Sequence, residues 1–230
     1  MKATIQLVSF FFLCLLIACS GPEGKKVEAK DAQASASEVK APNASSGDMA
    51  NFNLNKGTLT WTGSKLTGSS HTGAISVLSG NLKAQGDNIL SGEFVVDMNS
   101  IANTDLEAGK GKEKLEGHLK SADFFDVEQF PRATFVILGS KPAPEGGDAT
   151  HLITGNLTMK DVTKSIAIPA NVAVVENKLT AVTPSFVIDR TQWGIEYGSS
   201  SIAGLAKDKI ISNDIALVLS LEATANAPAQ

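Results

Sequence analysis

Cysteine is nearly absent from this sequence, which contains two, Cys14 and Cys19, among 230 residues. Both lie close to the start of the chain, so the remainder cannot form a disulfide even in an oxidising compartment. The three histidines, His71, His118 and His151, are scattered without the spacing of metal ligands. We therefore expect no disulfide framework and no metal site.

An excess of positive charge is also lacking. Lys and Arg total 20 against 24 Asp and Glu, which gives a net charge of −4. Removal of residues 1–18 takes away Lys2 and no acid, so 19 bases then face 24 acids, a net charge of −5. A weakly acidic chain is poorly suited to nucleic acid or to an anionic surface that needs a basic patch. We expect no nucleic-acid partner.

Motifs that carry catalysis are missing as well. His71 follows Ser69 and Ser70, but the chain has no Gly-x-Ser-x-Gly sequence and nothing identifies a third member of a triad. Gly-Lys-Gly-Lys at 109–112 lacks the spacing of a phosphate-binding loop and does not follow a strand. The sequence therefore predicts a protein that is not an enzyme and that has no cofactor.

The longest apolar run, residues 5–17, is too short for the roughly 20 residues of a membrane-spanning helix. It follows Lys2 and is typical of a secretory signal. Leu-Ile-Ala-Cys at 16–19 ends the run and resembles the lipobox of bacterial lipoproteins, in which the cysteine is acylated and becomes the first mature residue. We expect a signal peptide over 1–18 and a lipid on Cys19. An ordinary signal with a chance cysteine is the alternative.

The segment that follows Cys19 has little to bury. Between residues 20 and 50 it contains no aromatic residue and three large apolar ones, Val27, Val39 and Met49. Such a segment cannot offset the entropy that ordering would cost. We predict that 19–53 is a disordered tether with a reach of roughly 30 Å, and that 225–230 is a flexible tail.

From residue 54 to residue 224 the dominant period is two, as where Ile215, Leu217 and Leu219 alternate with smaller or polar residues. This period predicts strands, with turn residues between them. The predicted strands lie near 57–62, 72–84, 87–98, 132–139, 150–159, 164–175, 178–188 and 213–223. An antiparallel meander is the economical topology. Eight strands closed into a barrel can hold a small ligand, whereas a packed sandwich cannot, and the period alone fits both.

One segment departs from this pattern. Thr104 and Glu107 have the spacing of a capping box. Leu115 and Leu119 then fall on one face at helical spacing, together with His118 and Ala122. We predict one substantial helix that begins at Thr104 and ends near Lys120.

The stretch after this helix, SADFFDVEQFP at 121–131, sets three phenylalanines among three acids and ends at a proline, which cannot continue a helix. The phenylalanines either seal the helix against the strands or form an apolar lip for a cavity. The sequence leaves both roles open.

A set of sequence blocks runs in order across nearly the whole of 54–224. The blocks are Trp61–Lys65, His71–Gly73, Gly92–Ile101, His118–Asp126, Phe130–Phe135, Gly155–Thr158, Phe186–Arg190, Trp193–Gly194 and Tyr197–Gly198. With them the chain resembles the YceI-like family of secreted lipid-binding barrels. The resemblance implies an all-β fold, an extended eight-stranded antiparallel lipocalin-like barrel with one helix. It also implies an apolar interior that takes a polyisoprenoid or another long amphiphile, such as a quinone or fatty-acid derivative. The lipobox and tether suggest a membrane-anchored version of this domain.

A polyprenyl tail has no hydrogen-bonding groups, so its site needs apolar area and little else. Candidate ligand-binding side chains are those on the faces inferred to point inward and the aromatic residues of the following loop: Phe94, Val96, Met98, Phe135, Phe186, Ile188, Trp193 and Tyr197. The alternative is that these side chains fill the core.

Arg190, one of two arginines, shares strand parity with Phe186 and Ile188 and precedes a long loop, 191–212. Long loops often cover a site. Arg190 is therefore a candidate to bind an anionic head group. The alternative is an internal salt bridge to an acid such as Asp97 or Asp123.

Together these observations predict a lipid-anchored, non-enzymatic protein of the bacterial cell envelope. It would bind a lipophilic small molecule, with an isoprenoid-type lipid in the barrel, for storage, transport or stress protection. A homodimer stays open. The rival hypotheses are a hydrolase or isomerase acting on a lipophilic substrate in the same pocket, and a structural adaptor with a filled core.

Overall fold

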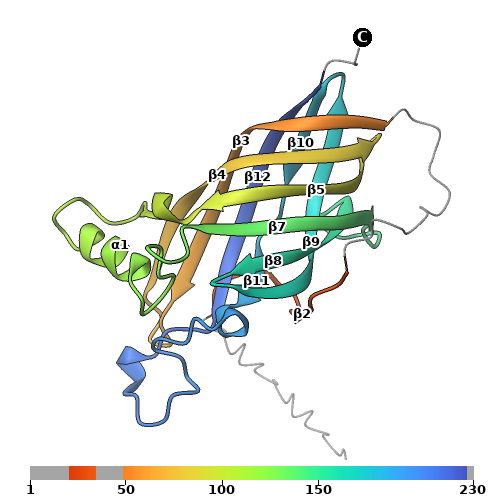
Figure 1. Ribbon diagram of the computed structural model, residues 1–230. Coiled ribbons are helices and arrows are strands. Elements are labelled where there is room, and N and C mark those ends of the chain that lie inside the picture. The colour runs from red at the N-terminus through yellow and green to blue at the C-terminus, as the bar shows by residue number, and fades with distance from the viewer. Residues whose placement is uncertain (1–20, 35–48, 227–230) are drawn as a thin grey trace, which may run out of the picture.

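The computed structural model describes residues 21–34 and 49–226, so the predicted signal peptide and Cys19 lie outside the described residues. A twisted antiparallel barrel makes up most of it (Figure 1). Its long strands are β3 (Met49–Ser64), β4 (Ser70–Gln85), β5 (Asn88–Asp97), β7 (Arg132–Pro142), β8 (His151–Met159), β9 (Val162–Val175), β10 (Lys178–Val182), β11 (Phe186–Asp189) and β12 (Asp214–Ala225). Each lies within a few residues of a predicted strand, or extends it.

The last strand closes the sheet. β12 pairs with β3 from Ala216 opposite Thr62 to Ala225 opposite Phe52. On its other side β12 pairs with both β10 and β11, which form one strand position interrupted around Pro184. The hydroxyl of Thr183 bridges this interruption, because it accepts a hydrogen bond of 2.8 Å from the amide of Leu219. The predicted all-β fold, a closed eight-stranded antiparallel barrel with one helix, is confirmed.

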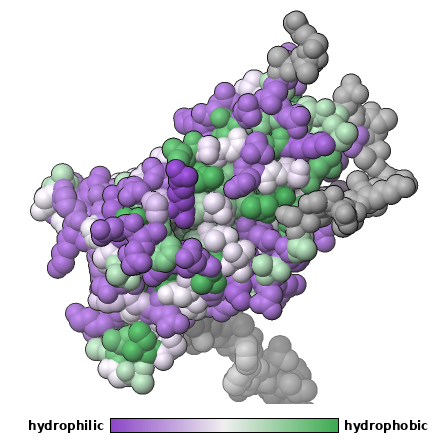
Figure 2. Space-filling view, viewed as in Figure 1, coloured by the Kyte–Doolittle hydropathy of each residue, from purple (hydrophilic) through white to green (hydrophobic). Residues whose placement is uncertain are grey.

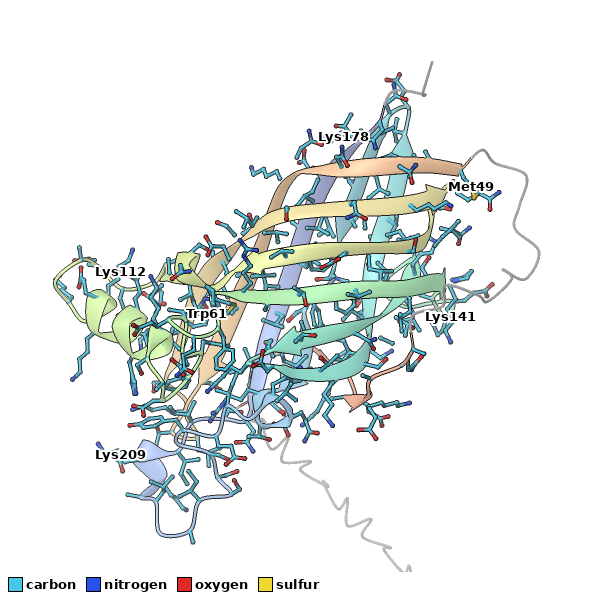
Figure 3. The ribbon with its side chains drawn as sticks, viewed as in Figure 1. Met49, Trp61, Lys112, Lys141, Lys178 and Lys209 are labelled. Atoms are coloured by element: carbon cyan, nitrogen blue, oxygen red, sulfur yellow. The ribbon has the colours of Figure 1, made fainter. Side chains whose placement is uncertain are left out.

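The barrel has two different ends. One end carries the connection from β5 to β7, with η1 (Met98–Ser100), β6 (Ala102–Asn103) and α1 (Lys112–Lys120). The same end carries the loop from β11 to β12, with η2 (Arg190–Trp193) and η3 (Lys207–Lys209), as Figure 1 shows. Trp61 lies toward this end, whereas Met49 and Lys178 mark the opposite one (Figure 3). We call the first the helix end.

The helix begins later than predicted. Gly111 is its N-terminal cap, with a φ of 104° that favours glycine, and the helix ends at Lys120 as expected. Thr104 does not cap a helix, because its amide donates to the carbonyl of Thr72 at 2.9 Å and its hydroxyl donates to the same oxygen at 3.1 Å. The prediction of a helix starting at Thr104 is wrong: the backbone there extends the sheet beyond β6, which pairs with β4.

The most unexpected element is the segment 25–31, which we call the N-terminal strap. Its strand β1 (Lys25–Lys26) runs parallel to β11, with Lys25 opposite Phe186. Its strand β2 (Lys30–Asp31) is antiparallel to β9, with Lys30 opposite Ser165. The strap therefore occupies the seam between β9 and β11, where these two strands do not pair with each other.

Side chains and backbone both hold the strap in place. The amide of Val27 donates to the carbonyl of Val187 at 2.9 Å, and the Val27 side chain is 9% exposed within the core. Lys26 forms an ion pair of 2.6 Å with Asp214. The predicted disordered tether is therefore wrong for residues 21–34. The seam offers unpaired backbone groups, and a polar segment can satisfy them without much apolar surface of its own.

Candidate functional site: an apolar cavity at the helix end

The barrel interior opens into a cavity of about 210 Å³ at the helix end. Its wall is almost entirely apolar, and its deepest side chains come from barrel strands. These include Leu59 and Trp61 on β3, Ile75 on β4, Val96 on β5, Ala133 on β7, Leu157 on β8, Ile188 on β11 and Leu217 on β12. Because alternate residues of a strand point to the same face, the inward positions of these strands line the cavity, whereas β9 and β10 contribute no residue to its wall.

The phenylalanine-rich stretch covers this cavity. Phe124 and Phe125 line it, together with Leu115 and Leu119 of α1. The backbone after α1 folds back sharply: the amide of Phe125 donates to the carbonyl of Leu119 at 3.1 Å, and Asp126 has a φ of 47°. Both roles left open by the sequence are therefore combined, since sealing the helix against the barrel also supplies the apolar lip.

Polar contacts fix this lip. The Phe124 carbonyl accepts a hydrogen bond of 2.8 Å from Lys160 Nζ, in the turn between β8 and β9. His118 Nε2 lies 2.9 Å from Asp123 Oδ2, and the His118 ring makes an edge contact with Phe124 at 4.9 Å. Asp123 and Asp126, the latter accepting from Gln129 Nε2 at 2.9 Å, thus bind neighbouring polar groups, and Phe124 and Phe125 are left for the cavity.

Arg190 lies at the boundary between the cavity and the loop that follows β11. It is 3% exposed, and its guanidinium donates to four backbone carbonyls. These acceptors are Ser212 (3.1 Å), Ile195 (2.6 Å), Tyr197 (2.9 Å) and Ile211 (3.3 Å). The guanidinium also lies over the Phe124 ring at 5.9 Å. Arg190 therefore holds both ends of the 190–213 loop across the helix end.

The charge of Arg190 is only weakly compensated. Burial lowers the pKa of the guanidinium from its ordinary value, and the nearby Asp189 carboxylate opposes this shift. The side chain still remains charged at neutral pH, because a guanidinium ordinarily loses its proton only far above neutral pH. Neither Asp97 nor Asp123 forms a salt bridge with it within the described residues. In place of the alternative internal salt bridge, backbone carbonyls face the cation with their partial negative charges.

The structure brings four of the predicted site residues to the cavity wall: Val96, Met98, Ile188 and Arg190. It places the other five elsewhere. Phe94 and Phe135 line a separate space of about 10 Å³ deeper in the barrel, and Phe186 is buried in the core. Trp193 is fully buried, with its Nε1 donating to the carbonyl of Leu157 at 3.0 Å. Tyr197 is 44% exposed and packs against His118 at 4.7 Å.

Sequence reasoning missed much of the wall, although the signal was present. Leu59, Trp61 and Leu157 lie on strands that were predicted, and Leu115 and Leu119 lie on the predicted helix face. Parity along each strand could have selected them. What it could not supply was the level along the barrel at which the interior is open.

A polar cluster stands at the rim. His71 lines the cavity and its Nδ1 lies 2.9 Å from Asp105 Oδ2. The Thr72 amide donates to Asp105 Oδ1 at 2.9 Å, and Asn103 Nδ2 donates to the same atom. Partial burial alone would raise the pKa of Asp105, but these hydrogen bonds outweigh it and hold the pKa below its ordinary value. The cluster ties β6 and the segment before α1 to β4.

Two searches of the described residues bear on other kinds of site. Among the residues that the structure describes, no three His, Cys, Asp or Glu side chains gather as metal ligands would. Over residues 21–34 and 49–226, no helix has the length and apolar character needed to cross a bilayer.

Comparison with known proteins identifies the family. The model of the YceI-like domain matches residues 32–223, so the chain belongs to the YceI-like domain family. A UPF0312 protein of Shewanella baltica (strain OS185) is 34% identical over 92 residues, which cover 36% of this chain and 46% of that protein. A UPF0312 protein of Vibrio vulnificus (strain YJ016) is 33% identical over 90 residues, with the same coverage. The chain spans about half the length of the curated relatives it matches.

A solved structure shares the fold. The polyisoprenoid binding domain from Saccharophagus degradans, implicated in plant cell wall breakdown, superposes with a TM-score of 0.54 and 19% identity. The match covers 78% of this chain and all of that one. At this identity the likeness supports the barrel architecture.

Proposed function

We propose that the protein is a lipid-anchored binding protein of the bacterial envelope that holds the tail of a lipophilic molecule in its barrel. The observation that carries the proposal is the apolar cavity at the helix end, with a volume of about 210 Å³. Its wall is almost entirely apolar and offers few polar groups that would retain water, so it is suited to a hydrocarbon. Each methylene that enters it contributes about 0.8 kcal/mol before the entropy lost on association is deducted.

The family supports a lipophilic ligand. The Saccharophagus degradans domain that shares the fold is described as polyisoprenoid-binding. A polyisoprenoid, quinone or fatty-acid derivative would place its tail in the cavity and its head group at the rim, near Lys65 and His71, which line the opening. Exposed apolar side chains at this end, Leu66, Tyr197 and Ile202, give an incoming lipid an apolar approach. Figure 2 shows apolar residues at the tip of the loop between η2 and η3.

The N-terminal strap gives the proposed anchor a short reach. Lys25, which pairs with Phe186 in β11, lies six positions after Cys19. At about 3.3–3.6 Å per residue, a fully extended segment of this length spans about 20 Å. An acyl chain on Cys19 would then hold the barrel close to the bilayer surface, where a lipid ligand is delivered. Storage, transport and protection against stress are all served by such a position.

Mass spectrometry of an organic extract from the purified protein tests the proposal. We expect a lipophilic molecule in stoichiometric amount that is chemically unchanged after long incubation with the protein. Conversion of that molecule to a product would support the rival enzyme acting in the same pocket. If repeated extracts contain no lipid and no added lipid is taken up, the proposed binding function is wrong and a structural adaptor is favoured.

A further inference from the structure

The barrel interior contains two separate spaces. The cavity at the helix end has a volume of about 210 Å³, whereas the next space along the axis has about 10 Å³. No residue lines both. Phe94 and Phe135 border the smaller space, and each lies two residues beyond a cavity-lining residue of its strand, Val96 and Ala133. On each of these strands, consecutive inward-pointing residues therefore change from lining the cavity to filling the core.

Two phenylalanines form this partition. Phe94 and Phe135 are directly opposite each other in the pairing of β5 and β7, with ring centroids 5.2 Å apart. We call Phe94 and Phe135 the phenylalanine partition. Aromatic side chains bury large areas, so a facing pair of them fills much of a narrow barrel at this level.

A glycine makes room for the partition. A Cβ atom at Gly155 would collide with the Phe135 ring, so the ring lies directly against the β8 backbone. The ring is therefore held against the β8 backbone rather than free to swing aside, because close-packed interiors resist displacement of large side chains. A hydrocarbon tail entering at the helix end must stop at this level.

We propose that the phenylalanine partition limits the enclosed part of the ligand to a short tail, of about eight to ten carbon atoms. This inference rests on the proposed binding function. A cavity of about 150 Å³ takes up a benzene molecule, with its six carbons, so 210 Å³ accommodates about eight. The matching class is a medium-chain acyl or short prenyl compound. A longer chain binds by its terminal units alone, and its remainder stays outside the barrel.

A series of n-alkanols from butanol to tetradecanol, titrated by calorimetry, tests the limit. Affinity should rise about fourfold with each methylene while the chain lengthens inside the cavity. We expect this rise to stop near octanol to decanol. A rise that continues unchanged to tetradecanol would overturn the inference while leaving the binding function intact. If no alkanol binds to the folded protein, the binding function itself fails, and the inference fails with it.

Three variants locate the limit at the partition. Ala133→Leu adds three carbons to the cavity wall. The rise in alkanol affinity should then stop at chains about three carbons shorter. Phe135→Ala opens the way to the deeper space and should move it to longer chains. Ile137→Ala removes side-chain volume beyond the partition and serves as the control, because Ile137 lines the smaller space and does not line the cavity. If the rise in affinity stops at the same chain length in all variants, something other than the partition sets the limit. Ala133→Leu keeps the test available if Phe135→Ala does not fold.

Discussion

The N-terminal strap leads to a quantitative prediction about stability. Val27→Ala removes two carbon atoms from a side chain that is buried in the core. At about 0.8 kcal/mol for each carbon, the free energy of unfolding should fall by about 1.5 kcal/mol. In a protein of this size that corresponds to a melting temperature lower by about 3–6 °C. Val175→Ala is the matched control, because Val175 is 68% exposed and the same truncation there loses little burial.

Tryptophan fluorescence provides the assay. Trp61 and Trp193 are both buried, so their emission reports on unfolding of the barrel during a urea titration. Hydrogen exchange adds a local measurement, since the Val27 amide donates to Val187 and should be protected. If Val27→Ala and Val175→Ala have the same urea midpoint, and the Val27 amide exchanges as fast as an unstructured one, the strap is not part of the barrel.

Three further predictions follow from other contacts. Arg190→Gln should lower the free energy of unfolding by about 2–4 kcal/mol, because four backbone carbonyls lose a charged donor, and should weaken the binding of neutral and anionic lipids alike; selective loss of anionic-lipid binding with an unchanged melting temperature would instead assign Arg190 to the head group. Asp105 has a lowered pKa, so its stabilising contribution is complete at pH values above its ordinary pKa of 3.8 and disappears as the pH falls through the pKa of the folded state. The stability of Asp105→Asn should therefore depend less steeply on pH in acid than that of the unmodified protein. Equal dependence of stability on pH in the two proteins would contradict this. Cys19→Ser should move the protein from the membrane fraction to the soluble fraction of fractionated cells, and an unchanged membrane pool would exclude the proposed anchor.

The barrel could be predicted from the sequence because its signal is local. Alternating side chains such as Ile215, Leu217 and Leu219 identify a strand without knowledge of its neighbours, and turn residues mark its ends. The observed β12 covers the predicted strand 213–223 to within two residues. Closure of the sheet by β12 and β3 depends on long-range pairing, and the resemblance to a barrel family supplied it.

The strap could not be predicted in the same way. Residues 25–31 read KKVEAKD, with Val27 as their one large apolar residue, and their order comes from backbone pairing with an open seam. That seam exists because the strand position shared by β10 and β11 is interrupted around Pro184. A pattern of side chains within the segment contains no information about it.

The candidate site was predicted in its chemistry and only partly in its position. Strand parity indicated inward-pointing Phe94 and Phe135, and both are buried. Parity does not tell whether an inward position borders open space or fills the core. That outcome depends on Gly155, which lets the Phe135 ring lie directly against the β8 backbone, and on the smaller Ala133 two residues nearer the helix end.

The central claim is that a lipophilic tail occupies the cavity at the helix end, and short-range quenching of Trp61 tests it most directly. Trp61 lines the cavity, whereas Trp193 does not. A Trp193→Phe variant leaves Trp61 as the single reporter, and Trp61→Phe leaves Trp193 as the matched control. A decanol brominated at the end of its chain should quench Trp61 fluorescence saturably and leave that of Trp193 nearly unchanged. Equal quenching of both tryptophans, or none in folded protein at saturating lipid, would contradict the account.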